Sequence, residues 1–499
     1  MMRRIALVAL MAPTVALAKP MIDDAHDRVQ TTLDPQMDRI GTLTPRSARE
    51  IGPSRIAIGC EMLPREYGDF ENFKEYMPPL GIARVRLHAG WAKLEPEPDK
   101  WNWEWLDRQV NWLIENGLEP LLETSYGNPA YPGAGGASLS DGIPTGEAAL
   151  AAWDRYVDKL AERYPQVKNW ACWNEPSNCK GNTPEQLADN NIRTARIIKR
   201  RIPDAKIGML VISWAYLDYT KRCFKVFKEQ DALKLFHWAI YHDYSPNPDT
   251  CYEQTVDKWA EFVRKEAPHL RIWQGESGAT SDPHFSAAIS SLKWNSELTQ
   301  AKWDARRVVA DLGHDFDTLV FTMYDPCYDY PERYCRQIPP YGVRTREDRF
   351  MKRMGLVKCN DQLEITKVKP AYYTVQNLAT LFDTTIEPAK LNVTLVKGEK
   401  AEGLVRYTFR QKGTKIPLIA FWDASDHPVN ENVLRHTTLD LRGATFDEPV
   451  WIDLVTGAIY RIPERMIVRD NRKAGMILED VPYYDAPVVI TERKLVMKD

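Results

Sequence analysis

A chain of 499 residues with 44% hydrophobic and 10% aromatic residues is long enough to bury a large core, and its length suggests two domains. Its formal net charge of −3 excludes a global positive field, so bulk affinity for nucleic acid or an anionic membrane is not expected. Any recognition that depends on charge must therefore be local.

The first eighteen residues have the pattern of a secretory signal peptide. Arg3 and Arg4 form a positive start, an apolar run follows to Ala18, and Ala16-Leu17-Ala18 supplies the small residues of a cleavage site. The apolar run is about fourteen residues long, short of the roughly twenty that a membrane-spanning helix needs. We therefore expect residues 1–18 to be removed and the mature protein to be secreted or periplasmic, without a membrane anchor.

Export permits disulfide bonds, and the chain has eight cysteines. Cys327 and Cys335 bracket one loop rich in Tyr, Pro and Arg, and this is the only specific pairing that the sequence suggests. Several other cysteines fall inside strand or helix patterns, where a buried free thiol is the usual finding. No pair has the CxxC spacing of a zinc or redox site.

Residues 19–54 lack sustained periodicity and predict an N-terminal extension that lies extended on the surface or is partly disordered. From Arg55 onward, apolar strand patterns alternate with amphipathic helix patterns. Eight strands are predicted, at Ile56–Gly59, Ala83–Leu87, Glu119–Glu123, Lys168–Trp173, Lys206–Val211, Phe236–Tyr241, Leu270–Gly275 and Thr318–Met323. Helices are predicted between and after them, at 105–116, 146–163, 184–201, 218–233, 253–267, 297–312 and 371–382.

Eight βα repeats over residues 55–382 predict an α/β fold of the (β/α)₈ barrel type. The competing fold is an open α/β sheet with a nucleotide site, but no predicted strand runs into GxGxxG or GxxxxGK[ST]. Residues 383–499 change to short alternating strands without helices, at 391–396, 403–410, 416–422, 437–441, 450–454 and 488–491. This part predicts a smaller C-terminal β-sandwich, packed rigidly on the barrel because no Gly/Ser-rich linker separates the two.

Two of the predicted barrel strands lead to a glutamate. The fourth runs into Trp170-Ala171-Cys172-Trp173-Asn174-Glu175-Pro176, and the seventh into Ile272-Trp273-Gln274-Gly275-Glu276-Ser277. The carboxyl ends of barrel strands build the active site. Hydrolysis of a glycosidic bond needs two carboxyl groups, about 5 to 5.5 Å apart when the anomeric configuration is retained. The pattern therefore predicts a glycosidase, although the residues alone leave open which glutamate is the acid.

These two motifs resemble the signature of clan A glycoside hydrolases, which are retaining (β/α)₈ enzymes, and the barrel-plus-sandwich arrangement resembles family 39 and related members. The resemblance implies that Glu175 is the acid/base and Glu276 the nucleophile, and that Asn174 contacts the sugar 2-hydroxyl. It covers most of residues 55–499, because 369–373 resembles the final barrel helix of the clan, and 450–455 with 485–488 resembles the small β-domain.

The resemblance extends to three further strands. Arg84-Val85-Arg86-Leu87-His88 is similar to the arginine region of strand 2, which implies that Arg86 hydrogen-bonds the nucleophile and that His88 lies in the substrate pocket. Tyr241-His242-Asp243-Tyr244 is similar to the strand-6 H-x-Y pattern, which places Tyr244 beside Glu276 and His242 near the sugar. Strand 8 departs from the pattern, because Phe321-Thr322-Met323-Tyr324-Asp325 lacks the usual tryptophan. Either Tyr324 replaces that stacking platform or the subsite differs in shape.

Aromatic side chains near strand ends are candidate sugar platforms, since a pyranose face suits an aromatic ring. They are Trp91, Trp173, Trp214, Trp273 and Tyr244, whereas most of the sixteen tryptophans are expected to pack in the core. For His88 and His242 the sequence favours hydrogen-bonded histidines that line the pocket over metal ligands, because no Asp/His cluster has ligand spacing. We therefore predict no metal and no organic cofactor.

The loop Tyr328–Arg353 carries seven Lys or Arg residues. Guanidinium groups match planar anions, so the loop could contact a uronate or a sulfate on an acidic substrate. The sequence favours the simpler alternative, in which these cations are solvated and pair with Glu332, Glu347 and Asp348 of the same loop.

Together these observations predict an exported hydrolase that cleaves a β-linked (or α-L) bond in an oligo- or polysaccharide through a glycosyl-Glu276 intermediate. Neither the sugar nor the oligomeric state is specified by the sequence. One alternative is a transglycosylase that uses the same residues with a sugar acceptor. Another is a non-catalytic carbohydrate-binding barrel. A pure binder would have no use for two convergent carboxyl groups that repel each other, which disfavours that alternative.

Overall fold

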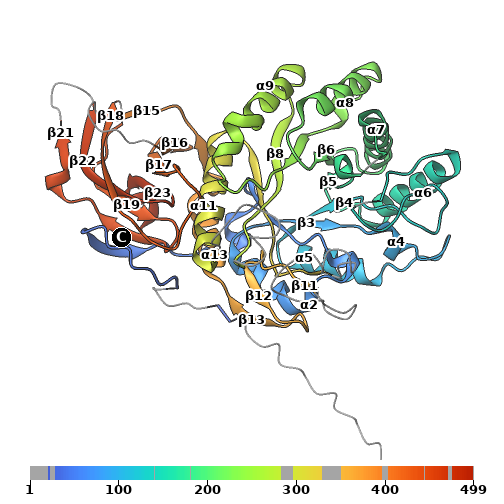
Figure 1. Cartoon of the computed structure of the whole chain (residues 1–499), viewed down its shortest axis with the longest axis horizontal. Helices are drawn as coiled ribbons and strands as arrows, with labels where there is room; N and C mark the ends of the chain where they lie inside the picture. The colour runs from blue at the N-terminus through green and yellow to red at the C-terminus, as the bar shows by residue number, and fades with distance from the viewer. Residues whose placement is uncertain are drawn as a thin grey trace, which may run out of the picture.

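The computed structural model describes residues 21–22, 28–139, 141–179, 181–282, 296–328, 350–395, 403–442, 444–469 and 475–497. These residues form a barrel and a sandwich that lie side by side (Figure 1). The expected fold class is confirmed. The predicted signal peptide, Cys335 and most of the arginine-rich loop lie outside the described residues.

Eight parallel strands pair in chain order, and the first pairs with the last to close the barrel. Their residues are almost all buried, as parallel strands covered on both faces require. All eight predicted strands are present with shifts of a few residues at their ends. They are β2 (Ile56–Gly59), β3 (Arg84–His88), β4 (Glu119–Glu123), β5 (Asn169–Ala171), β6 (Lys206–Ile212), β7 (Trp238–His242), β8 (Arg271–Ser277) and β9 (Asp317–Val320).

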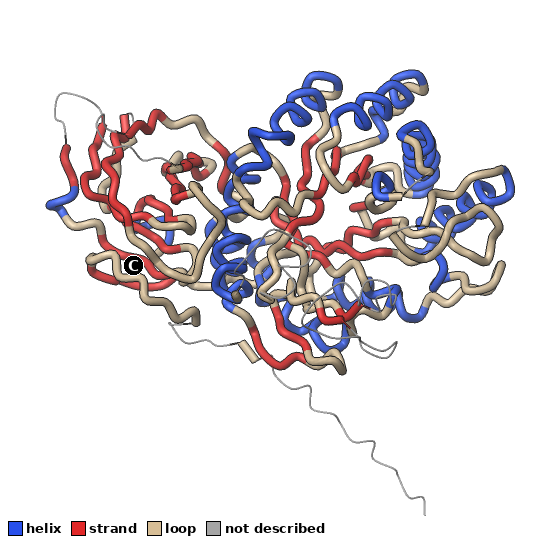
Figure 2. Tube along the Cα trace, in the orientation of Figure 1, coloured by secondary structure: helices blue, strands red, loops and turns tan. Residues whose placement is uncertain are grey.

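Long helices surround the barrel (Figure 2). They are α5 (Glu104–Glu115), α6 (Glu147–Arg163), α7 (Pro184–Arg201), α8 (Leu217–Glu229), α9 (Asp257–Glu266), α11 (Glu297–Gly313) and α13 (Pro370–Leu381). Thr183 and Ser296 begin α7 and α11 with capping boxes, in which side chain and backbone exchange hydrogen bonds with the third helical residue. Shorter helices are α1 (Ala48–Ile51), α2 (Phe70–Phe73), α3 (Met77–Leu80), α4 (Trp91–Leu94) and α14 (Arg493–Val496).

The C-terminal strands form two antiparallel sheets. The larger has the order β1-β20-β19-β23-β17-β16-β14 and the smaller β15-β18-β22-β21. The six predicted strands correspond to β15 (Asn392–Leu395), β16 (Leu404–Gln411), β17 (Pro417–Asp423), β18 (Arg435–Arg442), β19 (Pro449–Asp453) and β23 (Val488–Glu492). The unpredicted strands are β14 (Ile386–Pro388), β20 (Ala458–Arg461), β21 (Ile467–Arg469) and β22 (Gly475–Tyr483).

The N-terminal extension was expected to lie extended on the surface or to be partly disordered, and the structure adds a sheet pairing that was not predicted. Residues Asp38–Thr42 form β1, which pairs antiparallel with β20 at the edge of the larger sandwich sheet. Pairing supplies the backbone hydrogen bonds that a free arm would make with water. The sandwich is therefore built from both ends of the chain, with the barrel inserted between them.

The sandwich packs directly on α11 and α13 of the barrel (Figure 1). Lys302 of α11 is buried and pairs with Asp485 at 2.7 Å, and Arg306 donates to the carbonyl of Asp426 at 2.8 Å. Asn377 of α13 donates to the carbonyl of Leu454 at 3.1 Å. Because these buried polar groups find partners across the junction, the two bodies hold a defined orientation.

Two small hairpins between β9 and α13 were not predicted. One pairs β10 (Cys327–Tyr328) with β11 (Phe350–Met351), and the other pairs β12 (Val357–Cys359) with β13 (Ile365–Val368). They follow the carboxyl end of the last barrel strand, so they lie on the side of the barrel where the strands end. Among the described residues no helix combines the length and the apolar character that a membrane span requires.

Candidate active site

Glu175 follows β5 in a sharply turned segment. Trp173 (φ 67°) and Glu175 (φ 44°) both have left-handed backbone, which is uncommon and costly for such residues. The turn is held by the Glu175 backbone N–H, which donates to the carbonyl of Val211 at 2.8 Å. The carboxylate is almost fully buried, and its Oε2 accepts a hydrogen bond from Asn178 Nδ2 at 2.8 Å.

Glu276 is placed by a bulge in β8. Tyr241 of β7 pairs with Gln274 but His242 pairs with Glu276, so Gly275 is the extra residue. A Cβ at Gly275 would lie 2.4 Å from Ile240 Cγ2 and 3.3 Å from His242 Nε2, which only glycine avoids. Side chains normally alternate between the two faces of a strand. The extra residue shifts this alternation by one, so that the Glu276 side chain turns toward Glu175.

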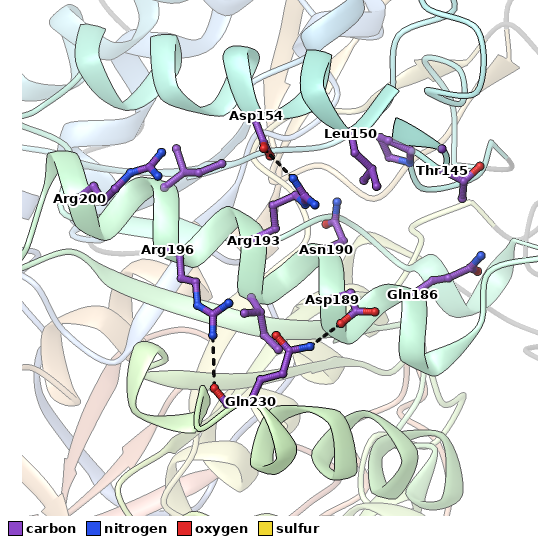
Figure 3. Close-up of a pocket in the computed structure, with 14 residues that line it drawn as sticks. Thr145, Leu150, Asp154, Gln186, Asp189, Asn190, Arg193, Arg196, Arg200 and Gln230 are labelled. Carbon is purple, nitrogen blue, oxygen red and sulfur yellow. Dashed lines mark hydrogen bonds and ion pairs between the residues drawn. The ribbon is translucent and has the colours of Figure 1, made fainter. Parts of the chain in front are cut away.

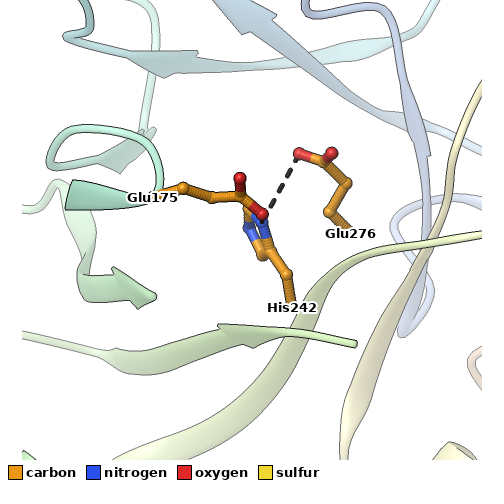
Figure 4. A group of neighbouring side chains, drawn as sticks. All are labelled: Glu175, His242 and Glu276. Carbon is orange, nitrogen blue, oxygen red and sulfur yellow. Dashed lines mark hydrogen bonds and ion pairs between the residues drawn. The ribbon is translucent and has the colours of Figure 1, made fainter. Parts of the chain in front are cut away.

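The two carboxylates meet at His242 of β7 (Figure 4). His242 Nδ1 lies 2.9 Å from Glu175 Oε1 and 3.5 Å from Glu276 Oε2. One oxygen of each carboxylate and this ring nitrogen all lie within 4.8 Å of one another. Two carboxyl groups from separate strands therefore converge at the spacing that a double displacement needs rather than at the wider spacing of inverting enzymes.

Arg86 of β3 connects the groups around Glu276. Its Nη1 donates to Glu276 Oε2 at 2.7 Å and to Glu61 Oε1 at 2.9 Å. Its Nη2 donates to Glu123 Oε2 and to Asn174 Oδ1, each at 2.6 Å. The guanidinium is buried, and every one of these contacts fixes a carboxylate or an amide in place.

Tyr244 completes the hydrogen bonds to Glu276, since its hydroxyl donates to Oε1 at 2.6 Å. Burial disfavours the charged form of Glu276, but His242, Arg86 and the Tyr244 hydroxyl outweigh it and lower the pKa of the carboxyl to about 2. Glu276 is therefore held as a carboxylate at neutral pH.

Asn174 is fixed on both ends of its amide. Its Oδ1 accepts from Arg86, and its Nδ2 donates to the Tyr126 hydroxyl at 2.7 Å. The NH₂ group has a second N–H donor, which is available to a ligand hydroxyl. His88 lies beside this network, with Nε2 3.0 Å from Glu123 Oε1, and burial lowers the pKa of its ring.

Two buried carboxyl groups at this site were missed in the sequence. Burial, opposed by Arg86 and assisted by Glu276, raises the pKa of Glu61 to about 8. Burial also favours the neutral form of Glu123. Arg86, His88 and the Ser125 hydroxyl outweigh this effect and lower the pKa of the carboxyl. Glu123 ends the predicted third strand, so the strand-end rule that singled out Glu175 and Glu276 applies equally to it.

Three predicted aromatic residues are not brought to the glutamates. Trp91 is fully buried between Tyr156 and Tyr131, with ring centroids 5.2 and 5.5 Å away. Trp273 packs on Trp238 at 5.1 Å inside the barrel, and Tyr324 stacks on Phe73 at 4.5 Å. Because their rings are buried against other side chains, these three residues act as core packing and offer no open platform for a sugar.

Of the other candidate platforms, Trp173 is buried against Tyr126 and Trp153, whereas Trp214 is 38% exposed. Trp214 follows Ser213, whose hydroxyl donates to Asn178 Oδ1 at 2.7 Å. Asn178 in turn binds Glu175. Trp214 therefore follows a segment that contacts the Glu175 side of the site, and its side chain is partly exposed.

Two cations approach the site, Arg65, which was not singled out, and Lys352 of the basic loop 328–353. The guanidinium of Arg65 lies over Tyr67 and Tyr126 at 4.9 and 5.3 Å, and its Nε is buried without a hydrogen-bond partner among the described residues. The Lys352 amine lies 5.7 Å from the ring centre of Tyr244. Burial lowers the pKa of this amine, whereas the charges of Glu276 and Glu175 raise it, which places Lys352 within electrostatic reach of both glutamates.

Glu175, His242 and Glu276 offer the atom types that a divalent cation binds. However, the Glu276 oxygen that faces His242 already accepts from Arg86 at 2.7 Å. A dication at this point would be repelled by the guanidinium. The donor set therefore fits a hydrogen-bonded carboxyl pair better than a metal centre.

A separate groove of about 540 Å³ lies over α6 and α7 (Figure 3). Its polar side chains are largely engaged with one another. Arg193 pairs with Asp154 at 2.6 Å, Arg196 donates to the carbonyl of Gln230 at 3.3 Å, and the Gln230 side chain donates to Asp189 at 2.7 Å. This groove contains neither glutamate and is not part of the site.

Comparisons with known proteins agree with this architecture. The chain shares its fold with solved clan A glycoside hydrolases. A family 39 glycoside hydrolase from the gut symbiont Bacteroides cellulosilyticus WH2 is 16% identical with a TM-score of 0.59, covering 90% of this chain and 83% of that one. A monomeric β-xylosidase from Caulobacter crescentus CB15 is 14% identical with a TM-score of 0.53, covering 91% and 97%. At these identities the likeness concerns the fold.

The family-model match lies in the first barrel units. The glycoside hydrolase family 42 model, described as β-galactosidase, matches residues 67–134. β-Galactosidase BgaP from Planococcus sp. (strain L4) is 28% identical over an alignment of 144 residues, and the match covers 24% of this chain. The match spans only 21% of that relative's length. The family-model match includes Arg86, Glu123 and Tyr126 but ends before both Glu175 and Glu276.

Proposed function

We propose that this chain is a retaining glycoside hydrolase. The observation that carries the proposal is the convergence of Glu175 and Glu276 on one nitrogen of His242, within 4.8 Å, from two separate barrel strands. That spacing suits a single sugar ring that contacts both carboxyl groups. The matching β-galactosidase sequences and the fold shared with a β-xylosidase support a β-glycoside as substrate.

In the first step, Glu276 attacks the anomeric carbon while the bond to the leaving oxygen breaks. Glu276 is suited to this role because Arg86 and Tyr244 hold it ionised. Glu175 gives its proton to the leaving oxygen, which departs as an alcohol and leaves a glycosyl ester on Glu276.

In the second step, Glu175 takes a proton from water, and the oxygen of that water attacks the anomeric carbon and releases Glu276. The two inversions restore the original configuration. His242 positions both carboxyl groups, and Asn174 offers its free N–H to a sugar hydroxyl. A transglycosylase would use the same intermediate with a sugar hydroxyl in place of water.

Azide trapping with 2,4-dinitrophenyl glycosides tests both roles. In Glu276→Gly, azide attacks directly from the vacated face, so the glycosyl azide should have the inverted configuration. In Glu175→Ala, azide captures the glycosyl ester, so the product should keep the configuration of the substrate. Buried Glu123→Gln serves as the control and should yield no azide adduct. Full turnover by Glu276→Gln, or binding of glycans with no turnover by the wild type, would refute the proposal and favour the non-catalytic alternative.

We further propose that the sugar bound at this site carries a negative group. Lys352 is within electrostatic reach of both glutamates and of Arg65, and the described residues offer no hydrogen-bond partner to the buried Nε of Arg65. Of the neighbouring loop cations, Arg353 already pairs with Asp325 at 3.2 Å. A sugar carboxylate, as a planar anion, could contact both of these positive charges.

Aryl uronides and the matching neutral aryl glycosides separate this substrate preference from catalysis itself. Lys352→Ala should lower kcat/KM for the uronide by about 10- to 100-fold, the cost of one charge-assisted hydrogen bond. It should change kcat/KM for the neutral sugar much less. Lys100→Ala, an exposed lysine elsewhere on the surface, is the control. Equal losses on both substrates would contradict an acidic substrate while leaving the hydrolase proposal intact.

Export is also proposed, on the signal pattern of residues 1–18. The expected mature chain begins at Lys19. N-terminal sequencing of protein recovered from periplasm or medium tests this, and an intact Met1 terminus in that fraction would contradict it.

A further inference from the structure

The end of the barrel opposite the glutamates holds a cleft that is larger than the groove over α6 and α7. It lies where the strands begin, next to β14 and β16 of the sandwich, and has a volume of about 1050 Å³. Arg84, Lys206 and Arg271 begin β3, β6 and β8, and Arg406 lies on β16. Pockets for single small molecules usually measure about 300 to 1,000 Å³, so this cleft has room for an extended ligand.

The cleft is strongly positive although the chain is not. Nine of its lining residues are Lys or Arg and four are Asp or Glu, whereas the whole chain has a formal net charge of −3. Opposing walls of one sign concentrate the field within such a cleft. Outside it, acidic residues outnumber basic ones, so the attraction for an anion is local to this site.

The few acids of the cleft are already engaged. Asp317 contacts Arg55 at 3.2 Å and Arg271 at 2.5 Å. Glu387 pairs with Arg410 at 2.7 Å, and Asp383 pairs at the same distance with Arg46. These carboxylates therefore leave little capacity to neutralise the remaining cations.

Two residues that line the cleft have buried donors without partners among the described residues. Arg84 lines the cleft and is only 7% exposed, yet its Nε has no hydrogen-bond partner in the described part of the chain. Arg55 Nη2 is likewise buried and unpartnered there. Burial, assisted by the charge of Lys206, lowers the pKa of His237 to about 4, as expected where positive charges gather. Unpaired buried N–H groups are costly, and an anion would satisfy them.

We infer that this cleft binds an acidic oligosaccharide, with a carboxylate or sulfate on successive sugars, at a second site separate from the glutamates. A row of anionic groups matches cations distributed along two walls. Nucleic acid fits less well, because a long phosphate chain would extend over the acidic remainder of the surface. The site would hold a charged polymer while the barrel mouth acts on another part of it.

Lys206→Ala/Arg406→Ala is the test variant, because both side chains are exposed and the described contacts assign neither of them an ion pair. Lys100→Ala/Lys159→Ala is the matched control, since it removes two exposed cations that lie outside the cleft. Titration calorimetry in a Glu276→Gln/Lys352→Ala background, which weakens binding of an acidic sugar at the glutamates, uses tetragalacturonate, a sulfated tetrasaccharide and a neutral tetrasaccharide at low ionic strength. Glu276→Gln prevents cleavage, and turnover of a neutral aryl glycoside by the otherwise wild-type double variants checks folding.

We expect the cleft variant to bind at least one acidic tetrasaccharide tenfold or more weakly, and the control variant to bind like its parent. Comparing the two acidic ligands tells carboxylate from sulfate recognition. Aryl glycoside turnover should be unchanged in both. Any of four results would overturn the inference. Two concern the variants: unaltered binding in the cleft variant, or equal losses in both variants. The other two concern the ligands: equally tight binding of the neutral sugar, or tighter binding of an oligonucleotide than of either acidic sugar.

Discussion

Arg86 Nη1 lies 2.7 Å from Glu276 Oε2, and both groups are buried. The same guanidinium also holds Glu61, Glu123 and Asn174. A planar fork with several donors can serve these acceptors together, whereas an ammonium group is a single point of charge. The geometry of Glu276 therefore depends on the shape of Arg86 as well as on its charge.

Arg86→Lys should retain the charge but lose this shared positioning. We expect kcat/KM on an aryl glycoside to fall by about 10²- to 10³-fold, the size of effect seen when a preorganised donor is removed. Arg84→Lys is the control, because it lies on the same strand but at the opposite end of the barrel. Activity close to wild type in Arg86→Lys would show that charge alone suffices.

Tyr244→Phe should shift the pH dependence of activity. The variant loses the 2.6 Å hydrogen bond that favours ionised Glu276, so the pKa of this carboxyl should rise from about 2. A hydrogen bond to a charged group contributes about 1.5 to 3 kcal/mol, or about one to two pKa units. The acidic limb of kcat/KM, measured from pH 3 to 8, should therefore move to higher pH. Tyr241→Phe, on β7 just before Tyr244, should leave it in place.

Much of this arrangement could be predicted from the sequence because parallel barrel strands are continuous apolar runs. All eight were found, and the strand-end rule located Glu175 and Glu276 before any contact was known. The aromatic residues were harder, since proximity to a strand end does not show which way a ring points. Trp91 and Trp273 are turned into the core, where neighbouring rings cover them.

Other features depend on contacts distant in the chain. β1 has no strong pattern of its own and becomes a strand by pairing with β20, more than 400 residues away. The pKa of Glu61 is raised by burial and by the charges of Glu276 and Glu123, against the opposing charge of Arg86, and these three residues come from three different strands. A local pattern in the sequence does not predict such an environment.

Glu61→Gln should change how stability depends on pH. In the folded protein the pKa of Glu61 is about 8, against a usual value of 4.5, so folding takes up a proton at neutral pH. The stabilisation is complete below about pH 4.5 and is lost as the pH rises through 8. Glutamine stays neutral, so the unfolding free energy in urea should fall less between pH 5 and 9. Exposed Glu66→Gln should keep the wild-type slope, and a Glu61→Gln slope equal to wild type would contradict the raised pKa.

Gly275→Ala should disturb the bulge that turns Glu276. The new Cβ would lie 2.4 Å from Ile240 Cγ2, so the strand or the isoleucine must move. Overpacking of this kind costs about 1 to 3 kcal/mol of unfolding free energy. We expect kcat to fall more than tenfold with that loss of stability. The double variant Ile240→Ala/Gly275→Ala removes the clash and should recover part of kcat, whereas no recovery would mean that the bulge has another cause.

Trp214→Ala should weaken binding of the leaving group. Trp214 is exposed and adjoins Ser213, which connects through Asn178 to Glu175, the proposed proton donor to the leaving oxygen. An aromatic platform contributes about 0.5 to 1.5 kcal/mol, so KM for an oligosaccharide should rise about 2- to 12-fold. A glycosyl fluoride of the same sugar has no leaving sugar to stack, and its KM should not change. Equal increases for both substrates would place Trp214 beside the sugar that is attacked instead, because only that sugar is common to the two.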